Sequence, residues 1–368
     1  MKFLAALLSV TIEFLRDLKG LALFLHQWSP GNPDHVFSNA TGRAFKLLLN
    51  GFGPDAGQLY DFNKYLPQDY LSDYEIFCKA AGISVEYRSM LSDRQVLTDF
   101  LSPWIRLPKV YGRIIEGRLL PASDIMYRPD TPGQVFTFLK YLLGMSPTLL
   151  VKRARTSGRD DGLRLSLGDE KSLLINGRRI NEMKAYRIID DLEDHIITEY
   201  IMQGDYAAAI FPGSCNSIRL LTMAAPKGGR PFFAGCFHRF GTADSAPSDR
   251  LGRGGCIAAI DDKTGQIGRC FMAVNRELTW ISHHPNTNVQ ILGTVVPNYQ
   301  AIKEFILKQH HRISYIPYLA WDIVVQNENF VVLGVDLNPD LKGIQAFNPI
   351  LASLPVREFY RHHGVIRR

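Results

Sequence analysis

The chain has 368 residues, of which 46% are hydrophobic and 21% charged, and its net charge is +6. These proportions exclude wholesale disorder, and the length predicts two or three lobes. Lysine and arginine are scattered and no zinc-finger spacing occurs, so we expect an anionic small ligand and no nucleic acid. The five cysteines show no CxxC spacing, which argues against a disulfide framework and favours a cytoplasmic protein.

The N-terminal segment carries apolar residues at helical spacing from Leu4 to Leu25, which predicts an amphipathic helix. The first apolar run ends at Glu13, so it is too short for a membrane span, and no cleavage site of a signal peptide follows it. Two interpretations stay open. The helix packs on its own domain, or residues 1–25 make a peripheral contact with a membrane surface.

Further elements follow in chain order. Two turn-rich stretches, Ser29–Asp34 and Asn50–Asp55, interrupt the N-terminal part, and a helix is expected over 71–81. Residues 1–85 therefore read as a helical region. After it we expect strands at 149–153, 163–167, 172–175, 196–201, 217–223, 232–237, 256–260, 318–325 and 330–337, with helices at 180–192 and 301–311. This pattern predicts an α+β fold.

The last two predicted strands are apolar but are interrupted by Asp322, Asp336 and Asn338. A buried carboxylate is costly unless it is paired or bound to a metal. Asp336 and Asn338 are two residues apart and share a strand face, and Asp322 joins that face if the connecting loop has an odd number of residues. Three such oxygen ligands suit Mg²⁺ bound together with phosphates. Alternatively, Asp322 pairs locally and Asn338 begins a simple turn.

Two further patterns bear on nucleotide binding. Lys152 ends an apolar strand, and the loop 156–162 that follows contains Ser157 and Gly158; such a loop can hold phosphate oxygens through its backbone N–H groups. The strand 196–201 ends on Glu199 and apolar residues, which could offer an acceptor and backbone groups to an adenine edge. Each pattern by itself is also typical of an ordinary surface strand.

The order of these segments resembles the ATP-grasp fold, and within it the sugar-transfer associated branch. Lys152 and its loop match the phosphate-binding strand and loop, and Asp322, Asp336 and Asn338 match the metal-binding strand pair. The remaining matches are the adenine hinge Glu199, Tyr200 and Ile201, the segment Ser214–Arg219, His238-Arg-Phe-Gly241, Gly254–Asp261 and His284-Pro285. The resemblance covers residues 85–345.

The resemblance implies a nucleotide clasped between two α+β lobes, residues 86–200 and 201–350, with residues 351–368 as a tail. ATP and Mg²⁺ are the expected cofactors. Lys152, Ser157, Gly158, Glu199, Tyr200, Ile201 and Asn216 are the expected ATP contacts. Arg219 and Arg239 are expected to steady the transferred phosphoryl group or the substrate carboxylate, or else to form structural ion pairs. Asp336 departs from the glutamate that is usual in the family.

The expected function is ATP- and Mg²⁺-dependent ligation of a small-molecule carboxylate to an amine through an acyl phosphate. The setting that the resemblance implies is the biosynthesis of a cell-surface polysaccharide, a peptide or another natural product. Two alternatives remain: a kinase that phosphorylates a hydroxyl on the same fold, and a nucleotide-binding module without catalysis. The sequence names neither the acid, the amine nor the oligomeric state.

Overall fold

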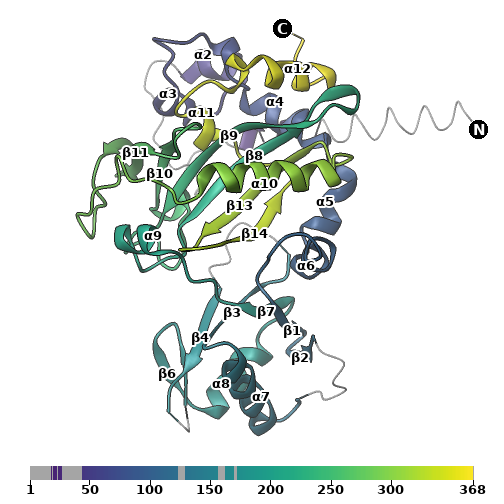
Figure 1. Cartoon of the computed structure of the whole chain (residues 1–368), viewed down its shortest axis with the longest axis vertical. Coiled ribbons are helices and arrows are strands. Elements are labelled where there is room, and N and C mark those ends of the chain that lie inside the picture. The colour runs from purple at the N-terminus through teal and green to yellow at the C-terminus, as the bar shows by residue number, and fades with distance from the viewer. Residues whose placement is uncertain are drawn as a thin grey trace, which may run out of the picture. The chain divides into compact units, whose positions relative to one another are not determined.

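A computed structural model describes residues 18, 20–22, 24–26, 44–122, 129–155, 162–169 and 172–367. The chain forms two compact units (Figure 1). Unit 1 comprises Met1–Arg88, Gln203–Glu328 and Asp336–Arg368, and unit 2 comprises Ser89–Met202 and Asn329–Val335. The predicted division into residues 1–85, 86–200, 201–350 and 351–368 stays a prediction.

Unit 2 is built on an antiparallel sheet with the strand order β2-β1-β7-β3-β4-β5-β6. Its strands are β1 (Val110–Ile115), β2 (Arg118–Pro121), β3 (Thr148–Arg153), β4 (Leu163–Leu167), β5 (Leu173–Ile175), β6 (Arg178–Ile180) and β7 (His195–Glu199). Its helices are α6 (Arg94–Leu101), α7 (Pro132–Met145) and α8 (Glu182–Asp190). Helices α7 and α8 pack together on one face of this sheet.

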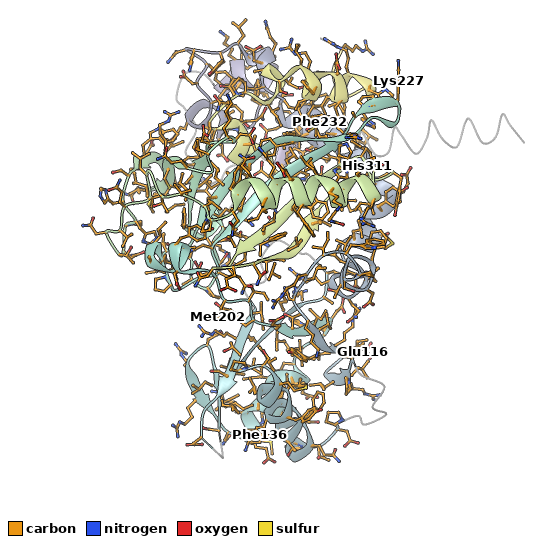
Figure 2. The ribbon with its side chains drawn as sticks, viewed as in Figure 1. Glu116, Phe136, Met202, Lys227, Phe232 and His311 are labelled. Atoms are coloured by element: carbon orange, nitrogen blue, oxygen red, sulfur yellow. The ribbon has the colours of Figure 1, made fainter. Side chains whose placement is uncertain are left out.

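Local sequence explains where the two covering helices begin. The Thr131 hydroxyl accepts the backbone N–H of Gln134, and Pro132 occupies the first helical position of α7. Asn181 caps α8 in the same way. Phe136 of α7 (Figure 2) is one of the apolar residues that bury this face of the sheet, together with Leu149 of β3.

The second sheet has the strand order β12-β11-β10-β9-β8-β13-β14; all its strands except β14 lie in unit 1, and of β14 only Asp336 does. Its strands are β8 (Ser217–Ala224), β9 (Pro231–Phe240), β10 (Cys256–Ile260), β11 (Ile267–Val274), β12 (Glu277–Ile281), β13 (Tyr318–Val325) and β14 (Phe330–Asp336). The N-terminal region adds α2 (Ala44–Leu49), α3 (Ala56–Leu59), α4 (Asp73–Cys78) and α5 (Val85–Leu91). The later helices are α9 (Asp205–Ile210), α10 (Tyr299–Arg312), α11 (Lys342–Gln345) and α12 (Leu354–His362). Short 3-10 turns lie at Pro67–Asp69, Ala80–Gly82, Pro226–Gly228, Leu251–Arg253 and Ile350–Ala352.

The two faces of the second sheet are covered differently. Helix α10 packs against β8 and β9, and its His310 contacts Trp321 of β13. Ala320, the neighbour of Trp321, points to the opposite face and joins a core with Phe359 of α12 and Tyr70 of the N-terminal region. Asp322 shares the face of Ala320, so the N-terminal region covers the same face that carries the candidate metal ligands.

The α+β fold with a helical N-terminal region is confirmed, and each predicted strand is present within a few residues of its expected bounds. Several elements escaped prediction, among them β1, β2 and α7 in unit 2 and β11 and β12 in unit 1. The predicted strand 330–337 was one residue too long. All five cysteines carry free thiols.

Most of the predicted N-terminal helix lies outside the described residues. Those of its residues that are described, 18, 20–22 and 24–25, are helical. Phe24 is buried against Tyr74 of α4, whereas Leu18 and Leu25 are exposed. Among the described helices, none is both long enough and apolar enough to cross a bilayer. Contact of residues 1–25 with a membrane surface stays a prediction.

Candidate active site

Lys152 and Glu199, two of the predicted ATP contacts, lie on the neighbouring antiparallel strands β3 and β7. In their register, Lys152 is opposite Ile196 and Leu149 is opposite Glu199. Directly opposed residues project from the same face of a sheet, and successive residues of a strand project from opposite faces. Lys152 and Leu149 are three residues apart, so the side chains of Lys152 and Glu199 project from opposite faces. The structure brings the two strands together but separates the two side chains.

The carboxylate of Glu199 is engaged within unit 2. Its Oε1 accepts a hydrogen bond from Arg106 Nη2 at 3.0 Å, and its Oε2 accepts the backbone N–H of Lys109 at 3.3 Å. The next residue, Tyr200, carries the guanidinium of Arg164 over its ring at 4.8 Å from the ring centre. The Glu199 carboxylate is therefore already hydrogen-bonded within unit 2, and a contact of residues 199–201 with adenine stays a prediction.

Ile201, the last residue of the predicted hinge, is 4% exposed. It follows Tyr200, whose backbone N–H donates to the carbonyl of Thr148 on β3 at 3.2 Å. Ser157 and Gly158, the predicted contacts in the phosphate loop, lie outside the described residues.

In unit 1, the register of β8, β9 and β13 places charged side chains on one face. Arg219 on β8 is directly opposite Asp322 on β13, and Ser217 on β8 is opposite Arg239 on β9. Arg219 donates from Nε and Nη2 to the two oxygens of Asp322 at 2.8 and 2.9 Å, which is a bidentate ion pair. Arg239 Nη2 donates to Asp322 Oδ1 at 2.8 Å. One carboxylate thus joins two guanidinium groups.

Arg239 also contacts Ser217, which lies in a predicted family segment, and Asp249, which was not predicted. Its Nε and Nη2 donate to the hydroxyl of Ser217 at 3.1 and 2.7 Å, and its Nε lies 3.4 Å from Asp249 Oδ2. Its Nη1 has no hydrogen-bond partner within the part of the chain that the structure describes. Two N–H donors of this guanidinium therefore remain available to an anion.

The charges in this cluster keep Asp322 ionised. Burial alone would raise the pKa of the Asp322 carboxyl, but the guanidinium groups of Arg219 and Arg239 outweigh burial and hold that pKa well below its ordinary value. Burial likewise opposes the charge on Arg219, yet Asp322 and then Asp336 raise the pKa of its guanidinium. Arg219 and Asp322 therefore hold each other in their charged forms.

Asp336 and Asn338 do not share a strand face as predicted, because β14 ends at Asp336. The Asp336 Oδ1 atom accepts the backbone N–H of Asn338 at 2.9 Å, which turns the chain just before Pro339. The other oxygen, Oδ2, lies 3.4 Å from Arg219 Nη1. Since Arg219 contacts both Asp322 and Asp336, the two carboxylates lie on the same side of the sheet, as the metal hypothesis requires.

Binding of Mg²⁺ by Asp322, Asp336 and Asn338 stays a prediction. Within the described residues, no group of three His, Cys, Asp or Glu side chains could hold a metal. Two carboxylates and the Asn338 amide suit an ion that takes further ligands from phosphates and water. The Asp336 side chain is 39% exposed, compared with 23% for Asp322, so Asp336 is the more accessible of the two carboxylates.

Asn216, another predicted ATP contact, uses its side-chain amide within unit 1. Its Nδ2 donates to two backbone carbonyls at 3.1 and 2.9 Å, and its Oδ1 accepts from Ser214 Oγ and the N–H of Gly241. His284 Nε2 lies 2.7 Å from the carbonyl of Gly241, so three separate family segments meet at this glycine. A Cβ at Gly241 would lie 2.2 Å from Ser214 Oγ, which explains the need for glycine. A contact between Asn216 and ATP stays a prediction.

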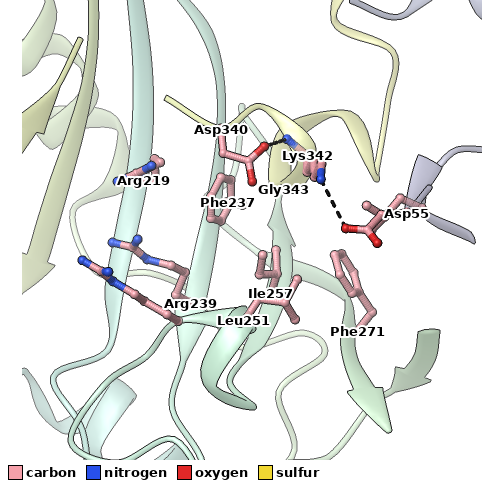
Figure 3. Close-up of a pocket in the computed structure, with 13 residues that line it drawn as sticks. Asp55, Arg219, Phe237, Arg239, Leu251, Ile257, Phe271, Asp340, Lys342 and Gly343 are labelled. Atoms are coloured by element: carbon pink, nitrogen blue, oxygen red, sulfur yellow. Dashed lines mark hydrogen bonds and ion pairs between the residues drawn. The ribbon is translucent and has the colours of Figure 1, made fainter. Parts of the chain in front are cut away.

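Arg219 and Arg239 line a pocket of about 260 Å³ in unit 1 (Figure 3). Opposite them are Lys342 and Asp55, which sequence reasoning missed because they are 287 residues apart. Lys342 Nζ lies 3.2 Å from Asp55 Oδ2 and 3.9 Å from Asp73 Oδ1. The apolar part of the lining includes Phe237, Leu251, Ile257 and Phe271.

Comparison with solved structures finds similar chains among ATP-grasp enzymes. The N5-carboxyaminoimidazole synthetase of Staphylococcus aureus in complex with ADP has 11% identity and a TM-score of 0.38, over 75% of this chain and 58% of that one. The D-alanyl-alanine synthetase A of Vibrio cholerae has 10% identity and a TM-score of 0.36, over 78% and 62%. The ATP-grasp ligase PsnB with a minimal precursor has 9% identity and a TM-score of 0.37, over 74% of this chain and 62% of that one. This chain thus spans about three fifths of the length of these three chains.

A search of curated proteins finds no match to the sequence. The profile of one family, described as sugar-transfer associated ATP-grasp, matches residues 86–352. That range is well over half of the chain, and it contains every predicted site residue from Lys152 to Asn338. It leaves out Asp55 and Asp73, which the N-terminal region contributes to unit 1. The chain belongs to the sugar-transfer associated ATP-grasp family.

Proposed function

We propose that this protein is an ATP- and Mg²⁺-dependent carboxylate–amine ligase that acts through an acyl phosphate. Membership of the ATP-grasp family supports the nucleotide chemistry. The observation that carries the proposal is the cluster in which Arg219 and Arg239 flank Asp322 beside a pocket. Such a cluster combines fixed positive charge with a carboxylate that remains ionised, which is the environment that phosphoryl transfer requires.

The site residues then divide into three roles. Lys152 holds ATP phosphates, and the backbone of residues 199–201 holds the adenine edge. Asp322, Asp336 and Asn338 hold Mg²⁺, which when bound neutralises charge on the phosphates. Asn216 maintains the strand connection around Gly241, and we assign it a positioning role.

The chemistry follows from the poor reactivity of a carboxylate, whose leaving group would be oxide. A carboxylate oxygen of the acid attacks the γ-phosphorus of ATP, and ADP leaves. The nitrogen of the amine then attacks the acyl carbon, phosphate leaves, and a proton passes from nitrogen to solvent. The available Nη1 donors of Arg239 are suited to the acid or to the phosphoryl oxygens as negative charge develops on them.

The substrates that we propose are small molecules, and the setting is biosynthesis in the cytoplasm of a cell-surface polysaccharide or a peptide. The family description, sugar-transfer associated, supports the first of these products.

Hydroxylamine trapping tests the reaction class. With ATP, Mg²⁺, a panel of carboxylic acids and hydroxylamine in place of the amine, the protein should release ADP and phosphate and form a hydroxamate. Asp336→Ala should abolish the signal, while Asp169→Ala, at an exposed hairpin of unit 2, should preserve it. Release of AMP and pyrophosphate, or a stable phosphate ester without hydroxamate, would contradict the proposal. The second result would favour a kinase instead.

A further inference from the structure

The helical residues in the range 18–26 meet the rest of unit 1 through a narrow face. Phe24 is 4% exposed, and its ring lies 5.9 Å from the ring of Tyr74 on α4. One turn earlier, a Cβ at Gly20 would lie 2.7 Å from the Cα atom of Cys78, so only glycine lets the two helices approach this closely. Gly20 and Phe24 are four residues apart, so a single stripe anchors this helix on α4.

A second face of the same helix is apolar and exposed. Leu18, Leu21 and Leu25 are spaced by three and four residues, so they share a face that is not the face of Gly20 and Phe24. Their side chains are 45%, 37% and 51% exposed. The sequence places further apolar residues on this face at the helical period: Leu4, Leu7, Phe14 and Leu15. The apolar face that the sequence predicts is thus not the one that packs on α4.

Helix α2 adds exposed apolar side chains next to α4. Phe45 and Leu49 are 74% and 71% exposed, more than any other large hydrophobic side chain in the described part of the chain. They are four residues apart, so both project from one face of α2. Just after α2, the carbonyl of Gly51 accepts the backbone N–H of Tyr74 at 2.9 Å. Tyr74, which is 37% exposed, therefore adjoins both apolar helices.

The charged side chains around Tyr74 favour an anionic partner. Lys46 of α2 is exposed, and Lys79 Nζ lies over the Tyr74 ring at 5.9 Å from its centre. The acidic residues of α4 are buried instead, since Asp73 and Glu75 are 2% and 7% exposed. The exposed side chains next to Tyr74 are therefore apolar or cationic.

The same balance holds for the whole of residues 44–88. Their sequence contains six acidic and four basic residues, but folding buries Asp55, Asp73 and Glu75. The charged side chains that are not buried are Lys46, Lys64, Lys79, Arg88, Asp61, Asp69 and Glu86. Burial thus converts a segment that is acidic in sequence into a surface with a small excess of positive charge.

A bilayer surface fits these observations better than a second copy of the chain does. Two copies paired along residues 18–25 would cover the leucines but leave Phe45 and Leu49 exposed. A bilayer accepts both helices at once, because leucine and phenylalanine side chains enter the boundary between headgroups and acyl chains independently of one another. Lysine side chains beside them remain at the level of anionic headgroups.

We infer that unit 1 docks on an anionic phospholipid bilayer through this surface. The docking surface consists of Leu18, Leu21, Leu25, Phe45, Lys46 and Leu49. Gly20 and Phe24 fix its leucines to the rest of unit 1. None of these residues lies in the range that the family profile matches, so docking does not depend on the proposed ligase activity.

Sedimentation of the full chain with lipid vesicles tests the docking surface. The vesicles contain phosphatidylserine and phosphatidylcholine in equal parts, and vesicles of phosphatidylcholine alone are the matched probe. The full chain should bind the anionic vesicles at least about fivefold more tightly, which is the effect expected of one lysine near an anionic surface. Added salt should weaken this binding, because it screens the attraction between lysine and headgroups.

Replacing Leu21 and Leu25 together by glutamine removes exposed apolar surface and leaves the contact with α4 intact. The double variant should bind anionic vesicles at least about tenfold more weakly, because two leucines no longer enter the bilayer. Phe45→Gln tests α2 in the same way and should also weaken binding. Leu167→Gln is the matched control, since Leu167 is 45% exposed and lies in unit 2, and it should leave binding unchanged. Thermal unfolding should show that all three variants are folded, because the replaced side chains are exposed.

Three results would overturn the inference: no sedimentation of the wild type with anionic vesicles, equal binding to phosphatidylcholine alone, or undiminished binding of the double variant. Analytical ultracentrifugation without lipid tests the other occupant. A wild-type dimer that dissociates when Leu21 and Leu25 are replaced would assign the leucine face to a second copy of the chain, and this result would also contradict the inference.

Discussion

Each unit contains an arginine between two aspartates, and the two clusters are close in composition and burial. In unit 2, Arg113 Nη2 lies 2.9 Å from Asp93 Oδ2 and 2.6 Å from Asp194 Oδ1. In unit 1, Arg219 binds Asp322 at 2.8 and 2.9 Å and lies 3.4 Å from Asp336. The arginine side chains are 24% and 14% exposed.

The surroundings of the two clusters differ. Asp93 also caps α6, because its Oδ1 accepts the backbone N–H groups of Gln95 and Val96 at 3.0 and 3.4 Å. Arg113 therefore links a helix start to a strand, which is a structural task. Arg219 lines the pocket, and its partner Asp322 is shared with Arg239, whose Nη1 is available. Residue types alone do not mark a site; donors that remain available beside a pocket do.

Removing the shared carboxylate should have the largest effect on stability. Asp322→Asn removes the carboxylate that two guanidinium groups share and should lower the free energy of unfolding by about 3 kcal/mol, the cost typical of breaking a buried pair. Asp194→Asn, whose side chain is 45% exposed, should cost only about 1 kcal/mol. Urea unfolding of both variants measures the difference. Equal losses would show that the two clusters do the same structural work.

The pH dependence of stability in the wild type and in Asp322→Asn tests the pKa shift of Asp322. The pKa of Asp322 is lower in the folded chain than in the unfolded chain, so the ion pair stabilises the fold above the ordinary aspartate pKa and loses this contribution as pH falls below it. The stability gap between wild type and Asp322→Asn should be constant near neutrality and should narrow below about pH 4. A gap that narrows already between pH 7 and pH 5 would contradict the direction of this pKa shift.

Replacing Arg219 should reduce the catalytic rate, whereas replacing Arg113 should not. Arg219→Gln should reduce hydroxamate formation at least about 100-fold, because a fixed donor to the transferring group is lost. Arg113→Gln should lower stability but leave the rate per folded molecule within about threefold, because Arg113 contacts only its own scaffold in the described structure. Comparable losses of rate in both variants would remove the functional distinction between the clusters.

Acid should weaken unit 1 before unit 2. In the described residues, the histidines whose pKa burial lowers all lie in unit 1. Burial lowers the pKa of His238 from 6.5 to about 3, so the unfolded chain binds the proton first and stability falls as pH drops below 6.5. At pH 5 this group alone should cost about 2 kcal/mol. Amide hydrogen exchange of β8 and β9 reports on unit 1, and that of β3 and β7 reports on unit 2. If exchange accelerates equally in both units as the pH falls, the expectation is contradicted.

The Lys152 variant has the smallest expected effect and tests the proposed ATP contact in unit 2. Lys152→Ala should weaken ATP binding at least about tenfold, because a charge-assisted contact to phosphate is removed. Lys184→Ala, an exposed residue of α8, is the matched control and should leave the affinity unchanged. Calorimetry with ATP and Mg²⁺ measures both. An unaltered affinity for ATP in the Lys152 variant would show that Lys152 does not contact ATP.

Local patterns in the sequence determined the fold class, most of the strands and the family. Apolar alternation identifies β3, β8 and β13 without any knowledge of their partners, because side-chain direction along a strand repeats every two residues. The order of Lys152, Glu199 and the Asp322–Asn338 strand pair was sufficient to recognise the ATP-grasp family. These properties depend on residues that are close together along the chain, so they can be read directly from the sequence.

Only the tertiary structure decided which charges meet. The sequence assigned Arg219 to the phosphoryl group and Asp322 to the metal, yet strand pairing across 103 residues makes them a bidentate pair. The sequence likewise gave no indication that Asp55 contacts Lys342, 287 residues away, or that one oxygen of Asp55 has no donor among the described residues. Ion pairs and pockets form between segments that packing brings together, and the energy that selects such partners comes from burial of the whole core, so no local pattern records them.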